Sequence, residues 1–93
     1  MKSTVLCVDD EPNILAALRR MLSLNNFKVL TADSGQTALE LLASTPVDVV
    51  ISDMHMPEMN GAELLAMVKE RHPDAMRILL TGNADISSAI AAV

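Results

Sequence analysis

The stretch VVISDMHMPEMNG, residues 49–61, begins as an apolar run, becomes acidic at Asp53, and continues through a loop with three methionines. The apolar run predicts a strand over residues 47–53, which is the most hydrophobic of the chain and is therefore expected to be central. Asn60 and Glu63 resemble a capping box, which predicts a helix directly after the loop. A buried strand that ends in a carboxylate and leads into a helix indicates a βα unit with polar chemistry at the strand's carboxyl end.

The same alternation of β-rich runs and helical stretches continues on both sides of this unit. Further strands are expected at residues 4–9, 27–32 and 76–81. A first helix is expected from Pro12 to about Leu24, and a second after a cap at Asp33 or Ser34. A third helix should run from Asn60 to the stop at His72 and Pro73, and a fourth should follow the segment GNAD at 82–85. The first strand does not alternate and should be buried on both faces, whereas the second alternates more and should be less buried. Right-handed crossovers then predict one α/β domain over residues 1–93, with an open doubly wound parallel sheet.

Polar residues stand at the carboxyl ends of three predicted strands. Asp9 and Asp10 end the first strand, Asp53 ends the third, and Thr81 ends the fourth. Ligands of doubly wound sheets bind at this edge, so these four residues are expected to converge there. At about 4 Å and an effective dielectric constant of about 20, each pair of carboxylates costs about 4 kcal/mol, which a bound cation would offset.

The residue types at this edge favour Mg²⁺ over other metals. Few carboxylates with room for water and phosphate suit Mg²⁺ better than Ca²⁺, and Cys7 and His55 offer too few soft ligands for zinc. A bound Mg²⁺ would keep Asp53 ionised, and an ionised aspartate can attack a phosphoryl group. Thr81 could donate its hydroxyl to a phosphoryl oxygen, and Gly82 lets backbone N–H groups approach it. The sequence therefore predicts formation of an acyl phosphate.

Composition excludes several other classes of protein. The 93 residues are 51% hydrophobic, which suffices for one packed domain, and the net charge of −5 argues against binding nucleic acid. No apolar run is long enough for a membrane span or a signal-peptide core, so a soluble cytoplasmic protein is expected. The single Cys7, inside a β-rich run, predicts a buried apolar residue without redox chemistry.

Three motifs together resemble the receiver domain of bacterial two-component response regulators, over all 93 residues. They are VDDEP at 8–12, DMHMPEMNG at 53–61 and LLTGNAD at 79–85. The resemblance implies a signalling module, not an enzyme, that works in a phosphorelay. In this family, Pro57 and Gly61 shape the loop after the phosphorylated strand.

The resemblance also implies a role for each residue at the acidic edge. Asp53 would accept a phosphoryl group from the phosphohistidine of a sensor histidine kinase or a phosphotransfer protein. Asp10, Asp53 and the backbone carbonyl of His55 would hold Mg²⁺, and Asp9 would bind it through water. The Thr81 hydroxyl would turn toward the phosphate, and the imidazole of His55 is expected to be exposed. Met54, Met56 and Met59 leave two alternatives open, a pliable surface for the kinase or packing of the loop on its own helix.

The sequence departs from the family in one respect. A complete receiver has the sheet order 2-1-3-4-5, and its fifth βα unit carries a phosphate-binding lysine and an aromatic residue that couples to output; the 93 residues contain neither. The order 2-1-3-4 is therefore expected here, and loss of the lysine should weaken transition-state stabilisation by about 2 to 4 kcal/mol.

Two further possibilities follow from this departure. One alternative function is a phosphorylation-impaired truncated receiver that acts as a dimerisation or kinase-interaction module. A homodimer is also expected, through the exposed edge of the fourth strand or through the last helix. A nucleotide-binding or redox flavodoxin-like domain is disfavoured, because DDEP stands where phosphate binding would need glycines.

Overall fold

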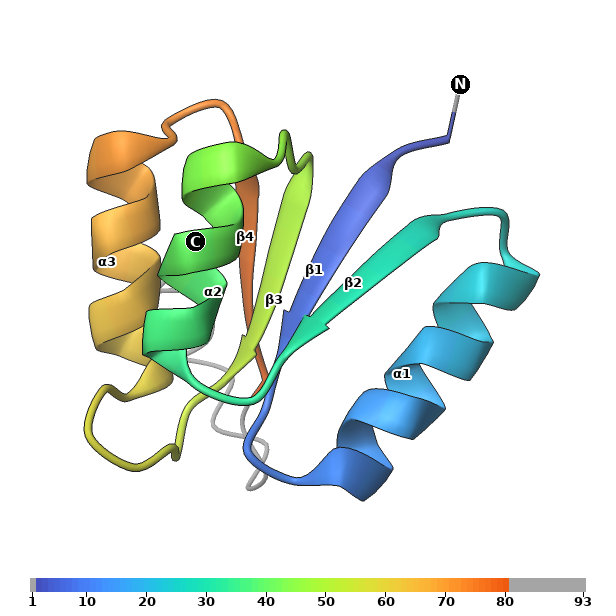
Figure 1. Cartoon of the computed structure of the whole chain (residues 1–93), viewed down its shortest axis with the longest axis horizontal. Helices are drawn as coiled ribbons and strands as arrows, with labels where there is room; N and C mark the ends of the chain where they lie inside the picture. Colours follow the sequence, from blue (N-terminus) through green and yellow to red (C-terminus); the bar gives the residue numbers. More distant parts are fainter. Residues whose placement is uncertain (1, 81–93) are drawn as a thin grey trace.

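Four parallel strands with helices on both faces make up residues 2–80, the part of the chain that the computed structural model describes (Figure 1). In chain order the elements are β1 (Thr4–Val8), α1 (Pro12–Leu24), β2 (Lys28–Ala32), α2 (Gly35–Ser44), β3 (Val49–Asp53), α3 (Gly61–Arg71) and β4 (Met76–Leu80). Helix α1 covers one face of the sheet, and α2 and α3 cover the other (Figure 1). The expected positions of Thr81, Gly82 and the last helix lie outside the described residues.

The strand order β2-β1-β3-β4 confirms the predicted sheet. All neighbouring strands are parallel, and the register aligns Val8 with Ala32 on one side and with Ser52 on the other. Asp53 is aligned with Leu80 across the β3–β4 pair. Because all pairs are parallel, the carboxyl ends of the four strands lie along one edge of the sheet.

Two apolar cores hold the layers together, one on each face of the sheet. The larger core joins β1, β3 and β4 to α2 and α3, and its fully buried side chains include Leu6, Val50 and Leu64. Burying each such side chain contributes about 1.5 to 3 kcal/mol. The smaller core joins β1 and β2 to α1 around Val5 and Cys7. Burial raises the pKa of the Cys7 thiol to about 11, so it stays protonated and apolar, as the sequence predicts.

Strand β3 has a neighbouring strand on each side, as its predicted central position requires, but its burial is uneven. The strand begins at Val49 rather than at residue 47, and Val49 and Ile51 are only half-buried, whereas Val50 and Ser52 are fully buried. Strand β1 is the more deeply buried strand, because helices contact both of its faces. Helix α1 packs over β1 and β2, which leaves the α1 side of β3 less covered within residues 2–80. Hydrophobicity predicted a buried strand correctly but did not reveal which neighbours cover it.

The helix starts follow the sequence signals. Ser34, not Asp33, caps α2, because its hydroxyl accepts the Thr37 backbone N–H at 3.1 Å. The predicted capping box opens α3: Asn60 Oδ1 accepts the Glu63 N–H at 2.8 Å, and Glu63 Oε1 accepts the Asn60 N–H at 3.0 Å. Capping of this kind stabilises a helix by about 1 kcal/mol. None of the helices within residues 2–80 combines the length and the apolar character that crossing a membrane requires.

Candidate phosphoacceptor and metal site

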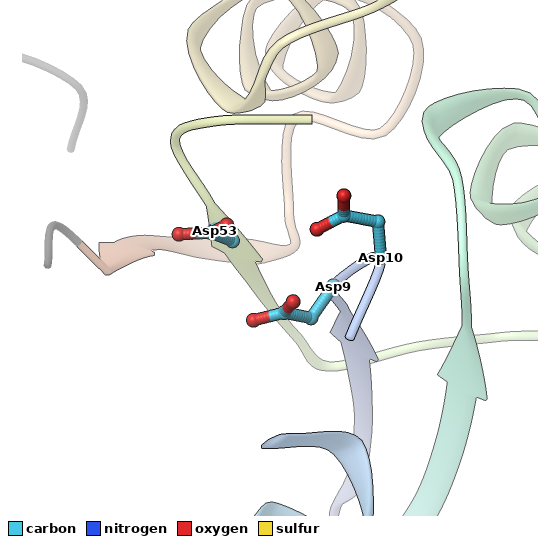
Figure 2. Close-up of side chains that lie close together, drawn as sticks. All are labelled: Asp9, Asp10 and Asp53. Carbon is cyan, nitrogen blue, oxygen red and sulfur yellow. The ribbon is translucent and has the colours of Figure 1, made fainter. Parts of the chain in front are cut away.

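Three carboxylates meet at the carboxyl edge of the sheet, as the sequence predicts. Figure 2 shows Asp9 and Asp10 directly after β1 and Asp53 as the last residue of the adjacent β3. One carboxylate oxygen from each of them lies within 4.8 Å of the other two. Asp9 is buried, Asp53 is half-buried and Asp10 is exposed, so the cluster opens from the sheet edge toward solvent.

The cluster lines an open cavity of about 470 Å³. Its lining residues are Asp9, Asp10, Glu11, Ile14, Asp53, His55 and Leu80. Four of these are acidic, and within residues 2–80 the lining contains no lysine or arginine to balance their charge. A larger cavity of about 520 Å³ lies at the opposite edge of the sheet, between the carboxyl ends of α2 and α3, and lacks this cluster. The chemistry, not the size, therefore identifies the site.

The electrostatics of the site are clearest at Asp9. Burial raises the pKa of its carboxyl above the ordinary 3.8, and the neighbouring charges of Asp53, Asp10 and Glu11 raise it further. A hydrogen bond that the Glu11 backbone N–H donates to Asp9 Oδ1 at 2.9 Å lowers the same pKa and only partly compensates. The folded chain therefore binds the Asp9 proton more tightly than the unfolded chain does.

We expect Asp9→Asn to stabilise the metal-free protein by about 1 to 2 kcal/mol at neutral pH, because it removes a buried charge that faces two others. The amide oxygen of asparagine can still accept the Glu11 N–H. Because the folded-state pKa of Asp9 is raised, the ionised carboxylate destabilises the fold fully at pH values above that pKa. This destabilisation is lost as the pH falls toward 3.8 and the carboxylate is protonated. Urea unfolding of both proteins should show that the variant's larger free energy of unfolding approaches that of the wild type as the pH is lowered over this range. An advantage that is absent at pH 7, or that grows on acidification, would contradict the assignment.

The donor set fits a hard divalent cation. All three side chains offer carboxylate oxygens, their 4.8 Å span can be bridged by one ion, and no lysine or arginine of the described lining competes for them. His55 also lines the cavity, and its imidazole is exposed, as predicted. Thr81 and Gly82, the other predicted members of the site, lie outside the described residues.

The loop between β3 and α3 is fixed by backbone contacts around Asp53. The Met54 N–H donates to the Leu80 carbonyl at 3.1 Å, and the Gly61 N–H donates to the Met54 carbonyl at 2.9 Å. A Cβ at Gly61 would lie 2.1 Å from the Asp53 carbonyl oxygen, so only glycine fits there. This close approach gives a physical reason for the glycine that ends the motif.

The loop methionines pack on the protein itself. Met56 is buried in the larger core, and Met54 and Met59 are half-buried against it. Met59 also contacts the start of α2, because its side chain covers Gly35. Within the described residues, these contacts favour the packing interpretation over a free surface for a kinase.

Sequence reasoning missed one polar residue beside the site. Ser52 is fully buried, and its hydroxyl donates to the Asp53 carbonyl oxygen at 2.9 Å. A single polar residue inside the apolar run VVIS was the available signal, because a buried hydroxyl needs a hydrogen-bond partner.

Comparisons with known proteins give matches over nearly the whole chain. The family model described as the response regulator receiver domain matches residues 5–93. The hydrogenase transcriptional regulatory protein HoxA from Cupriavidus necator is 44% identical over 92 residues, which cover 99% of this chain but 19% of HoxA. The chain therefore spans about a fifth of the length of the curated relatives it matches.

Solved structures show the same fold. The signal receiver domain of an HD domain-containing protein from Pseudomonas fluorescens Pf-5 is 40% identical, with a TM-score of 0.89 over 99% of this chain and 73% of that one. The response regulator TrrA from Thermotoga maritima, in complex with Mg²⁺ and BeF, is 36% identical, with a TM-score of 0.88 over 98% of this chain and 78% of TrrA. In another structure TrrA is in complex with the histidine kinase ThkA, and there the identity is 38% and the TM-score 0.82, over 95% of this chain and 78% of that one. The motifs, the sheet order, the acidic edge and these matches lead to one conclusion: the chain belongs to the response regulator receiver domain family.

Proposed function

We propose that Asp53 of this receiver domain accepts a phosphoryl group from the phosphohistidine of a sensor histidine kinase or a phosphotransfer protein. The observation that carries this proposal is the convergence of Asp9, Asp10 and Asp53 on one open cavity whose described lining contains no lysine or arginine. The complex of TrrA with a histidine kinase supports the class of partner. Asp53 is the acceptor because it is half-buried, at the strand end, with the other two carboxylates beside it.

The transfer exchanges one bond to phosphorus for another. A carboxylate oxygen of Asp53 forms a bond to the phosphorus atom while the bond from phosphorus to the donor imidazole nitrogen breaks, and the electron pair stays on that imidazole. Asp53 must be ionised for this attack. The carboxyl edge of the sheet holds its side chain where a donor can approach from solvent, since Asp10 and His55 on the cavity wall are exposed.

Asp10, Asp53 and the backbone carbonyl of His55 would hold Mg²⁺ directly, and Asp9 would hold it through water. When bound, Mg²⁺ supplies positive charge that offsets the repulsion of the carboxylates and of the incoming phosphoryl oxygens. We assign Thr81 as the hydroxyl donor to the phosphate and Gly82 as a backbone contact to it, on the basis of the LLTGNAD motif. Asp9 and Asp10 would orient the ion and its water, not react themselves.

Calorimetry should detect Mg²⁺ binding to the wild-type chain and at least a tenfold weaker affinity in Asp10→Ala, because that variant removes a direct carboxylate ligand. Asp33→Ala is the matched control, since Asp33 is an exposed aspartate directly after β2 that lies outside the cluster. Its affinity should equal that of the wild type. Equal binding by Asp10→Ala, or no binding by the wild type, would refute the metal assignment.

A phosphoryl-donor assay tests the proposed function against a module that only binds kinases. The wild-type chain is incubated with acetyl phosphate, with Mg²⁺ or with a chelator, and its intact mass is measured. A phosphoacceptor gains one phosphoryl group in the presence of Mg²⁺, and a module that only binds a kinase gains none. All three carboxylates are present and converge, which favours a phosphoacceptor over a module that only binds kinases.

We also propose that two copies of the chain associate along β4. Within residues 2–80, β4 pairs with β3 alone, and its Met76 and Leu80 are 59% and 38% exposed. An open strand edge with apolar side chains favours pairing with a second strand. Light scattering on a sizing column should give a dimer for the wild type and a monomer for Met76→Lys, whereas Met21→Lys, at a 54% exposed methionine of α1, should stay dimeric. A monodisperse wild-type monomer would contradict this.

A further inference from the structure

Ser52 is a hydroxyl placed in an apolar environment. It is 0% exposed, it lies two residues after Val50 on the same face of β3, and its strand neighbours are Val8 and Leu79, which both belong to the larger core. Such a site normally holds an aliphatic side chain, because an unbonded buried hydroxyl is unfavourable. The Ser52 hydroxyl meets this requirement by donating to the Asp53 carbonyl oxygen at 2.9 Å.

The same carbonyl belongs to a peptide that has a contact at each of its two ends. The Asp53 oxygen lies against Gly61, where a Cβ would come within 2.1 Å of it. The other end of the peptide, the Met54 N–H, donates to the Leu80 carbonyl at 3.1 Å. The Ser52 hydroxyl therefore completes a set of contacts that fixes the orientation of the peptide from Asp53 to Met54.

We propose that Ser52 is a positioning residue for phosphoryl transfer: its hydroxyl fixes the Asp53–Met54 peptide and thereby the direction of the Asp53 carboxylate. This inference rests on the proposed function of Asp53 as acceptor. The orientation of a side chain follows from the backbone that carries it, and in-line attack on phosphorus tolerates little misplacement. Without the hydroxyl, the carbonyl loses one of the contacts that fix its direction, and the orientation of the peptide is less tightly defined.

The test compares Ser52→Ala with Val50→Ala. Ser52→Ala removes only the hydroxyl oxygen, and Val50→Ala removes fully buried methyl groups two residues earlier on the same face of β3, away from the Asp53 carbonyl. Phosphorylation rate constants with acetyl phosphate are measured at Mg²⁺ concentrations that calorimetry shows to be saturating for each variant. We expect Ser52→Ala to be slowed roughly tenfold, the factor that corresponds to one lost positioning hydrogen bond. Val50→Ala should keep the wild-type phosphorylation rate, although its unfolding midpoint should fall by at least as much as that of Ser52→Ala.

A spectroscopic measurement separates positioning from stability. The ¹⁵N resonance of Met54 reports on the peptide that carries the Asp53 carbonyl, and it should shift in Ser52→Ala and stay near its wild-type position in Val50→Ala. A wild-type chain that is not phosphorylated at all would refute the proposed function itself. Phosphorylated wild type with an equally fast Ser52→Ala, or with both variants slowed alike, would overturn the role of Ser52.

Discussion

Asp53→Asn is expected to abolish phosphoryl transfer from acetyl phosphate to the chain. An asparagine amide has nearly the same shape as the carboxylate, but its oxygen carries no full negative charge and does not attack phosphorus at neutral pH. The fold should be retained, because removing one of three clustered carboxylates relieves repulsion instead of creating a cavity. Intact mass after incubation with donor and Mg²⁺ should show a phosphorylated wild type and an unmodified variant.

The control for this substitution is Asp33→Asn. Asp33 follows β2 at the same edge of the sheet and is exposed, but it does not belong to the carboxylate cluster. The control should be phosphorylated as fast as the wild type. A phosphoryl adduct that survives Asp53→Asn would show that another residue is the acceptor.

Gly61→Ala is expected to destabilise the domain by about 3 kcal/mol or more. The new Cβ would lie 2.1 Å from the Asp53 carbonyl oxygen and 2.8 Å from Leu79 Cδ1, and the backbone oxygen cannot move without disturbing β3. The clash outweighs the gain of at most about 1 kcal/mol in helix propensity. Urea unfolding, followed by circular dichroism, measures the loss.

Gly35→Ala provides a matched comparison for the clash. Gly35 is also a buried first residue of a helix, directly after the cap Ser34, but its added Cβ would meet only the flexible side chain of Met59, with Sδ at 2.6 Å. A methionine tip can rotate away, so this variant should lose about 1 kcal/mol or less. Equal losses at Gly35 and Gly61 would show that the approach to the Asp53 carbonyl is not what requires glycine at 61.

The βα unit at residues 47–71 shows what the sequence could and could not predict. The apolar run, the acidic end and the Asn60–Glu63 capping box are local signals, and the structure confirms the strand, the helix and the cap. The partial burial of β3 depends on which helix covers it, which is set by distant residues. The contact of Gly61 with the Asp53 carbonyl likewise depends on how tightly the helix returns to the strand.

The acidic site was predictable for a related reason. Parallel topology brings all carboxyl strand ends to one edge, so the positions of Asp9, Asp10 and Asp53 in the sequence sufficed to predict that they meet. The role of Ser52 was not predictable in this way, because its hydrogen bond depends on the direction of a single carbonyl group. The sequence also leaves open which residue caps α2, because both Asp33 and Ser34 are good capping residues. In the structure the Ser34 hydroxyl accepts the Thr37 N–H.

The most direct test of the central claim is to map the modified residue. The wild-type chain is treated with acetyl phosphate and Mg²⁺, the acyl phosphate is reduced with borohydride, which converts a phosphorylated aspartate to homoserine, and the peptides are sequenced by mass spectrometry. The proposed function predicts homoserine at position 53 alone, and none when Mg²⁺ is chelated. Homoserine at position 9 or 10, or an unmodified chain in the presence of Mg²⁺, would contradict it.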